Sequence, residues 1–236
     1  MTDADVLAFG AHPDDIELGC GGTVAKLTDA GHSVVLVDLT RGELSTRGTV
    51  EERQMEAEAA RVILGAVARV NMELTDSDLG ATPAAKRAVA EVIRRFKPRL
   101  ILVPYWHDRH PDHVHASELV YEGAFLAGLL RYETGQVSHR PTKVIYYMGW
   151  EEFTPSFIVD ISGQFERKME AIRAHASQFT LADPSYPETR LTAPATDRLI
   201  RSRMAHYGAL IGKEYGEGLL IRSVLEIENP LEARFS

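Results

Sequence analysis

The chain has 236 residues and a formal net charge of −8, with 44% hydrophobic and 25% charged residues. This length needs no more than one α/β domain, which we expect to span residues 1–236. The acidic balance and the lack of a Lys/Arg cluster argue against nucleic-acid binding. No apolar run approaches the ~20 residues that cross a bilayer, so we expect no membrane partner. A single cysteine and no sign of a signal peptide indicate a cytoplasmic protein.

The first half of the chain alternates between strand and helix patterns. Short apolar or β-branched runs predict strands at Val6–Phe9, Ser33–Asp38, Ala68–Met72 and Leu100–Val103. A glycine-rich turn, Gly19–Gly22, leads into the first helix, which continues to about Ala30, and further helices are expected over Glu51–Leu64 and Pro83–Phe96. Thr40–Thr49 reads as a polar loop.

This order predicts a Rossmann-like α/β fold: a mostly parallel sheet with helices on both faces. In such sheets ligands bind beyond the carboxyl ends of the strands, where we expect the active site. Beyond residue 140 we expect strands over Val144–Met148 and Phe157–Val159 and helices over Phe165–Ala176 and Thr196–Gly212. Between those helices, Thr180–Pro194 reads as a long loop of the kind that often forms a lid.

Two clusters of polar residues follow predicted strands. His12-Pro13-Asp14-Asp15 comes after the first strand, and His107–His115 comes after Leu100–Val103. One such histidine would ordinarily be a surface or capping residue, but two clusters at separate strand ends are less easily accidental. A catalytic zinc site needs about three N/O ligands and an open position for water. Not all of these groups can therefore bind the metal, and the remainder could act as base and acid.

Other histidines and the glycines carry weaker signals. We expect His32 and His139 to lie at the surface, and His107 and His115 to face solvent or shape their loop. Gly19-Cys20-Gly21-Gly22 departs from the G-x-G-x-x-G pattern of nucleotide loops, and two carboxylates precede it. Close packing of a helix on the sheet explains these glycines better.

Ala11-His12-Pro13-Asp14-Asp15 and His110-Pro111-Asp112-His113 resemble the two signature motifs of the LmbE-like (PIG-L) zinc deacetylases. The loop Asp38–Thr49 with Arg53, and Ala174–Phe179, resemble further family motifs. The resemblance implies His12, Asp15 and His113 as ligands of one Zn²⁺ per chain, with another divalent ion as the alternative. It implies Asp14 as general base, and His110, supported by Asp112, as the group facing the oxyanion. It also implies a homo-oligomer, such as a hexamer.

Within the family, the chain is most similar to the bacillithiol-biosynthesis enzymes that deacetylate N-acetylglucosaminyl malate. The stretches Asp5–His12, Pro104–His113 and Tyr215–Gly218 carry this similarity. One departure concerns a tyrosine that some relatives place near the active site. The corresponding loop here reads Ala193-Pro194-Ala195, and whether Tyr186 replaces that tyrosine stays open.

An anionic substrate would need local positive groups in so acidic a protein. Arg53 and Arg109 are the candidates for the malyl carboxylates, since arginine binds a carboxylate through two parallel hydrogen bonds. The alternatives are that Arg53 caps a helix and that Arg109 pairs with Asp108. Glu43 and Ser45, in the loop after the second strand, are further candidates for substrate binding.

The alternative substrates are other acetamidosugars: a chitooligosaccharide, a mycothiol-type precursor or an antibiotic precursor. A sugar- or metal-binding module without turnover is the alternative in another class. Asp14 argues against it, because a pure binder has no use for an unliganded carboxylate beside a metal.

Overall fold

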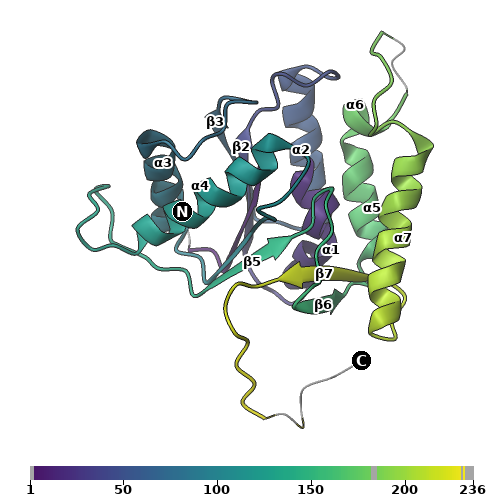
Figure 1. Ribbon diagram of the computed structural model, residues 1–236. Helices are drawn as coiled ribbons and strands as arrows, with labels where there is room; N and C mark the ends of the chain where they lie inside the picture. The colour runs from purple at the N-terminus through teal and green to yellow at the C-terminus, as the bar shows by residue number, and fades with distance from the viewer. Residues whose placement is uncertain (1–2, 182–184, 230, 232–236) are drawn as a thin grey trace.

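A seven-stranded sheet lies at the centre of the computed structural model, which describes residues 3–181, 185–229 and 231. The strand order is β3-β2-β1-β4-β5-β7-β6 (Figure 1). The strands are β1 (Val6–Gly10), β2 (Val34–Thr40), β3 (Ala68–Leu74), β4 (Leu100–Pro104), β5 (Lys143–Tyr147), β6 (Phe157–Asp160) and β7 (Gly216–Leu220). Pairing is parallel from β3 through β5, whereas β7 runs antiparallel to both of its neighbours.

Helices cover both faces of this sheet, as the sequence predicts (Figure 1). The helices are α1 (Asp15–Asp29), α2 (Val50–Leu64), α3 (Pro83–Phe96), α4 (Pro111–Ala127), α5 (Phe165–Ala174), α6 (Ala176–Phe179) and α7 (Pro194–Leu210). Leu7 and Phe9 of β1 pack in one core with α3 and α4, whereas Val6 and Ala8 pack in the other with α1 and α2. Burial on both faces explains why the central strands are apolar throughout rather than alternating.

The glycine run corrects one sequence prediction. Gly19–Gly22 forms no turn before the first helix but lies within α1, which kinks at Cys20. A Cβ at Gly19 would stand 2.1 Å from Cδ2 of Tyr147, and one at Gly22 would stand 2.7 Å from Cδ1 of Ile161. The glycines therefore let α1 approach the sheet and its neighbours closely, which confirms the packing interpretation over the nucleotide one.

Two helices in the second half depart from the sequence prediction. The helix expected over Phe165–Ala176 ends at Ala174, and the short α6 follows after His175. The helix expected from Thr196 begins at Pro194, and residues 182–184 of the preceding predicted loop lie outside the described residues. Among the described helices, none is long and apolar enough to cross a membrane.

Candidate metal centre

The parallel topology brings the two polar clusters together at the carboxyl edge of the sheet. β1 and β4 are neighbours, so the chain leaving each strand reaches the same region. His12 and Asp15 lie where β1 passes into α1, and Pro111 opens α4 with His110 as its N-cap. His113 then falls in the first turn of α4. This is the active-site position that the fold class predicts.

His12, Asp15 and His113 each offer a ligand atom, and these atoms all lie within 4.8 Å of one another. His12 Nδ1 is 3.5 Å from one Asp15 carboxylate oxygen, and His113 Nε2 is 3.1 Å from the other. The three residues are buried. Two imidazoles and one carboxylate are a donor set that suits a catalytic zinc site with an open position.

Carboxylates lie behind both histidines. Asp76 and Asp112 each place an oxygen 3.2 Å from His12 Nε2, and Asp108 places one 3.1 Å from His113 Nδ1. Histidine ligands usually donate their second ring N–H to such a carboxylate, which fixes the tautomer and the ring orientation. His12, His110 and Asp112 form a second group of possible ligands. Because Asp76 and Asp112 contact His12 Nε2, the other ring nitrogen, Nδ1, is left to bind a metal. This favours the group of His12, Asp15 and His113.

Two of these carboxylates were missed in the sequence analysis. Asp76 follows the end of β3, so the rule that located the other clusters could have found it. Asp108 lies in the His107–His115 cluster, where the sequence suggests Arg109 as its partner. Because aspartates near strand ends are common, the sequence alone does not assign Asp76 or Asp108 to a particular histidine.

The carboxylates control the protonation of the histidines. Burial alone would lower the pKa of His113, but Asp15 and Asp108 outweigh it and raise that pKa to about 10. Burial also opposes protonation of His12, yet Asp112, Asp15 and Asp76 hold its pKa well above the usual range. Both imidazoles therefore carry protons near neutral pH when no cation is bound, and a cation would have to displace them.

Asp14 stands apart from the ligand group. Its backbone φ of 130° lies in a region that non-glycine residues rarely adopt, a form of strain that clusters at active sites. Burial raises the pKa of Asp14 to about 6; the Arg53 charge opposes this shift and Asp15 adds to it. Asp14 Oδ2 is 3.6 Å from Arg53 Nη2. A strained, buried carboxylate with a raised pKa beside a metal site is suited to accept a proton.

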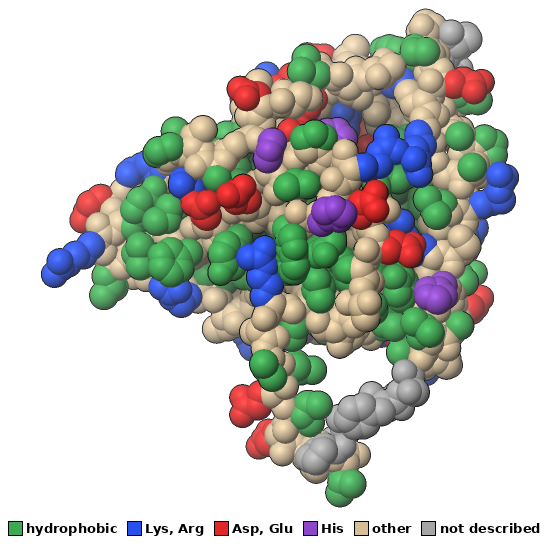
Figure 2. Space-filling view, in the orientation of Figure 1, with side chains coloured by type: hydrophobic (Ala, Val, Ile, Leu, Met, Phe, Trp, Pro, Cys, Tyr) green, Lys and Arg blue, Asp and Glu red, His purple; other side chains and the backbone are tan. Residues whose placement is uncertain are grey.

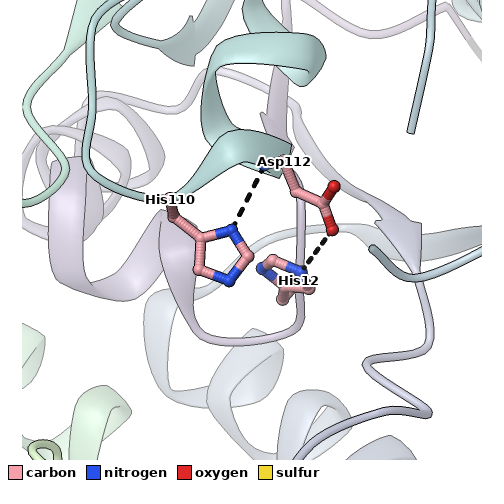
Figure 3. A group of neighbouring side chains, drawn as sticks. All are labelled: His12, His110 and Asp112. Carbon is pink, nitrogen blue, oxygen red and sulfur yellow. Dashed lines mark hydrogen bonds and ion pairs between the residues drawn. The ribbon is translucent and has the colours of Figure 1, made fainter. Parts of the chain in front are cut away.

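His110 and Asp112 interact differently from the sequence expectation. The Asp112 backbone N–H donates to His110 Nδ1 over 3.2 Å, whereas the Asp112 carboxylate contacts His12 Nε2 (Figure 3). Burial, together with the nearby His12 and His113, lowers the pKa of His110. The neutral ring therefore accepts at Nδ1 and carries its proton on Nε2. Asp112 sets the tautomer of His110 through its backbone N–H, because its carboxylate already lies on His12.

An open cleft of about 240 Å³ lies over this group. Ser45 and Arg53 line the cleft, as do Leu44, Gln178 and Leu191. Ser45 Oγ donates to the Gln178 side chain. Arg53 is 3% exposed, and its guanidinium donates to the backbone carbonyls of Gly42 and Pro13.

The other two candidates for substrate binding lie outside this lining. Glu43 accepts a hydrogen bond from the Asp76 backbone N–H. Arg109 is exposed, and its guanidinium lies 5.2 Å from the ring centre of Trp150, which does line the cleft. Arg190 covers the same ring at 4.6 Å. Arg109 and Arg190 thus place two positive groups at one wall of the cleft.

The remaining histidines divide into surface and buried residues. His32, His107 and His115 are exposed, as expected, and so is His206. His139, which was expected at the surface, is half-buried and contacts the Pro98 carbonyl. His175 is fully buried, with its Nε2 3.5 Å from a Glu17 carboxylate oxygen.

Fold and site together define an α/β protein with a buried His-Asp-His group at the carboxyl edge of its sheet, a group that could hold a metal ion. The model of the GlcNAc-PI de-N-acetylase family, PIG-L, matches residues 7–124. Diacetylchitobiose deacetylase of Thermococcus kodakarensis is 33% identical over 91% of this chain and 81% of the relative. The chain therefore belongs to this family of deacetylases.

Solved structures agree on the fold. The conserved protein TT1542 of Thermus thermophilus superposes with a TM-score of 0.88 at 34% identity, covering 98% of this chain and 99% of that one. The 4-carboxy-2-hydroxymuconate hydratase of Pseudomonas putida superposes with a TM-score of 0.76 at 24% identity, covering 97% and 99%. Because one similar structure is a hydratase, the fold alone does not define the reaction.

Proposed function

We propose that this chain hydrolyses the N-acetyl group of an N-acetylglucosaminide with one zinc ion held by His12, Asp15 and His113. The observation that carries the proposal is the buried ligand group with Asp14, a separate carboxylate, beside it. Another divalent ion is the alternative to zinc. When bound, such a cation lowers the pKa of water from 15.7 to about 7 and polarises a carbonyl.

The protein groups would divide the remaining chemistry among them. Asp14 accepts the proton of the attacking water and returns it to the departing amine. His110 presents its Nε2–H to the acetyl oxygen as negative charge develops there. The Asp112 backbone N–H supports this role, because it occupies Nδ1 and leaves the donor on Nε2. The carboxylates of Asp76 and Asp108, 3.2 Å from His12 Nε2 and 3.1 Å from His113 Nδ1, keep the two ligand imidazoles oriented.

For the substrate we propose N-acetylglucosaminyl malate, as in bacillithiol biosynthesis. Arg109 and Arg190 on the ring of Trp150 provide two guanidinium groups for the malyl carboxylates. Arg53 is the weaker candidate, since its donors already bind backbone carbonyls and its charge faces Asp14. Ser45 lines the cleft and is a candidate for contact with the sugar hydroxyls.

The metal assignment is tested by elemental analysis of the parent and His113→Ala. We expect one divalent ion per parent chain and a clear loss in the variant. Full metal retention in His113→Ala would refute the ligand set.

The substrate assignment is tested by release of free amine from three compounds: the malyl glycoside, the methyl glycoside and diacetylchitobiose. We expect Arg109→Ala to lower the malyl-to-methyl ratio of kcat/KM by about 10- to 150-fold, the worth of one charge-assisted contact of about 1.5–3 kcal/mol. An unchanged ratio would mean that Arg109 does not contact the aglycone. No preference of the parent for the malyl compound would leave only the broader deacetylase proposal.

A chitooligosaccharide is the second candidate substrate, supported by the 33% identity to the diacetylchitobiose deacetylase. The same assay separates the two, because diacetylchitobiose carries no carboxylate for the arginines to bind. A metal-loaded protein that releases amine from none of the compounds would favour a binding module.

A further inference from the structure

A second, smaller cavity adjoins the metal centre, and we call it the inner cavity. Its free volume is about 40 Å³, against about 240 Å³ for the open cleft. Asp15, Leu18, His113 and Trp150 line both spaces, so the cleft and the inner cavity meet at these side chains. His12, Asp14 and His110 line the cleft but not the inner cavity. The inner cavity therefore meets the site at two of the three proposed metal ligands.

Apart from Asp15 and His113, the inner cavity is lined by apolar residues and by polar side chains that already have partners. Besides the shared residues, its apolar surface comes from Pro104 at the end of β4 and from Leu199 and Ile200 of α7. Its polar side chains are already engaged elsewhere. The Tyr147 hydroxyl donates to the Phe9 carbonyl, and the Thr196 hydroxyl donates to the Arg190 carbonyl.

Arg203 is occupied in the same way. Its guanidinium donates to the carbonyls of Gly149 and Trp150 and to the Glu152 carboxylate. These bonds hold the Gly149–Trp150 wall in place. Gly149 has no room for a side chain, since a Cβ there would stand 2.4 Å from an Asp108 oxygen. The wall is thus fixed between Arg203 of α7 and the carboxylate that lies behind His113.

From this geometry we propose that the inner cavity receives the acyl chain of the substrate and that Leu199 limits the length of that chain. The inference rests on the proposed deacylation. An amide that reacts at the metal centre has a polar sugar on its nitrogen side and an apolar alkyl group on its carbonyl side. The wide polar cleft suits the sugar, and the narrow apolar cavity suits the alkyl group. A space of about 40 Å³ holds about three water-sized groups, so it admits a short chain only.

Leu199 is the best position for a test. It lines the inner cavity but belongs to none of the hydrophobic core clusters, whereas Ile200 packs against one of them. Leu199→Ala removes three carbon atoms from the wall with little cost to the core. Leu199→Phe does the opposite and fills the cavity. Leu191 supplies a matched control, because it lines the open cleft and not the inner cavity.

The experiment measures kcat/KM of the metal-loaded protein with methyl glucosaminides that carry N-acetyl, N-butyryl or N-hexanoyl groups. We expect the parent to discriminate against hexanoyl, and Leu199→Ala to raise the hexanoyl-to-acetyl ratio by about tenfold or more, the worth of a methylene or more in an apolar pocket. Leu199→Phe should lower the butyryl-to-acetyl ratio. Leu191→Ala should leave both ratios unchanged, whatever it does to the affinity for the sugar.

A binding measurement provides a readout without turnover. Calorimetric titration with hexanoate and acetate should show that Leu199→Ala gains affinity for hexanoate relative to acetate. A parent that hydrolyses hexanoyl and acetyl compounds equally would overturn the inference, as would an equal shift of the ratio in Leu191→Ala. If the parent hydrolyses none of the compounds, the proposed function fails and the inference fails with it. If it hydrolyses them but Leu199→Ala changes no ratio, only the inference fails.

Discussion

Asp14 and Asp15 are adjacent carboxylates with opposite shifts in pKa. Burial acts against the charged form of both. In Asp15 the neighbouring His113 and His12 outweigh that effect and hold the pKa well below its usual range. In Asp14 burial prevails and raises the pKa to about 6. Two carboxylates whose environments separate their pKa values can take two roles, here a ligand and a base.

We expect Asp14→Asn to retain its metal but lose about 10²–10⁴-fold in kcat, since the base is removed and the ligands are not. The base form of Asp14 exists above its pKa, so parent activity should rise with pH up to about 6 and level off above it. A bound cation would lower the pKa of Asp14 and move this rise in activity to lower pH. Metal content and a pH–rate profile test both points. Activity of Asp14→Asn within a few-fold of the parent would rule Asp14 out as the base.

The carboxylates behind the histidines lead to a second prediction. Asp108→Asn keeps the shape of the side chain but replaces a charged partner of His113 Nδ1 with a neutral one. Loss of such a partner typically costs about 10–100-fold in metal affinity. Competition with a chelator measures the affinity, and Asp78→Asn, outside the group, provides a control. Equal affinities of parent and Asp108→Asn would mean that Asp108 does not support His113.

At this scale the sequence was informative about the ligand group and less so about its surroundings. Two clusters at strand ends bring His12, Asp15 and His113 together, and the structure places their ligand atoms close to one another. The contact of the Asp112 carboxylate with His12, while its backbone N–H binds His110, depends on how α4 begins, which spacing alone does not reveal.

At the scale of elements, one buried arginine connects two loops at the rim of the cleft. Arg47 lies in the loop after β2 and is 1% exposed. It donates to the backbone carbonyls of Ser177, Thr180, Tyr186 and Pro187. Its guanidinium also lies 5.4 Å from the ring centre of Tyr186. Tyr186, the candidate to replace the tyrosine of some relatives, thus helps to anchor the loop before α7.

Arg47→Ala should therefore destabilise the protein and loosen the cleft. Removing the guanidinium leaves several carbonyls without their donor, at about 1–3 kcal/mol for each that stays buried. We expect a total loss of about 2–4 kcal/mol in the free energy of unfolding and a higher KM. Denaturant unfolding measures the former. Arg41→Ala, an exposed arginine of the same loop, should stay within about 0.5 kcal/mol of the parent. Similar behaviour of the two variants would contradict the role of Arg47.

The sequence did not predict β7 and α4, because neither element carries a strong local signal. β7 contains two glycines within Gly216–Leu220 and has no alternating pattern. Its strand conformation depends on pairing with β5 and β6, which its local sequence does not show. α4 begins at a histidine N-cap, which is not among the usual capping residues, although Pro111 at its first position was an available signal. The β1 to β4 region was predictable because local periodicity and burial agree there.

At the scale of the whole molecule, one face carries several exposed apolar residues. Figure 2 shows hydrophobic side chains across the face that contains α4 and β5. Tyr121 and Phe125 of α4 are 45% and 54% exposed, and Leu130 and Val137 beyond it are 88% and 78% exposed. Large exposed apolar patches on a protein surface commonly mark an interaction site.

The homo-oligomer implied by the family resemblance is the last prediction, and this face is where we expect it to form. A stable interface buries about 1,200–2,000 Å² in total. The exposed apolar residues on α4 and the segment after it would supply part of that area. Light scattering at micromolar concentration should give a mass of several chains, and Phe125→Asp with Leu130→Asp should shift it toward one, because each buries a charge in the contact. Val62→Asp places the same charge on α2, which packs in the other core, at a residue that is 61% exposed. It should leave the mass unchanged. A monomeric parent would refute association, and a double variant that keeps the full mass would place the contact elsewhere.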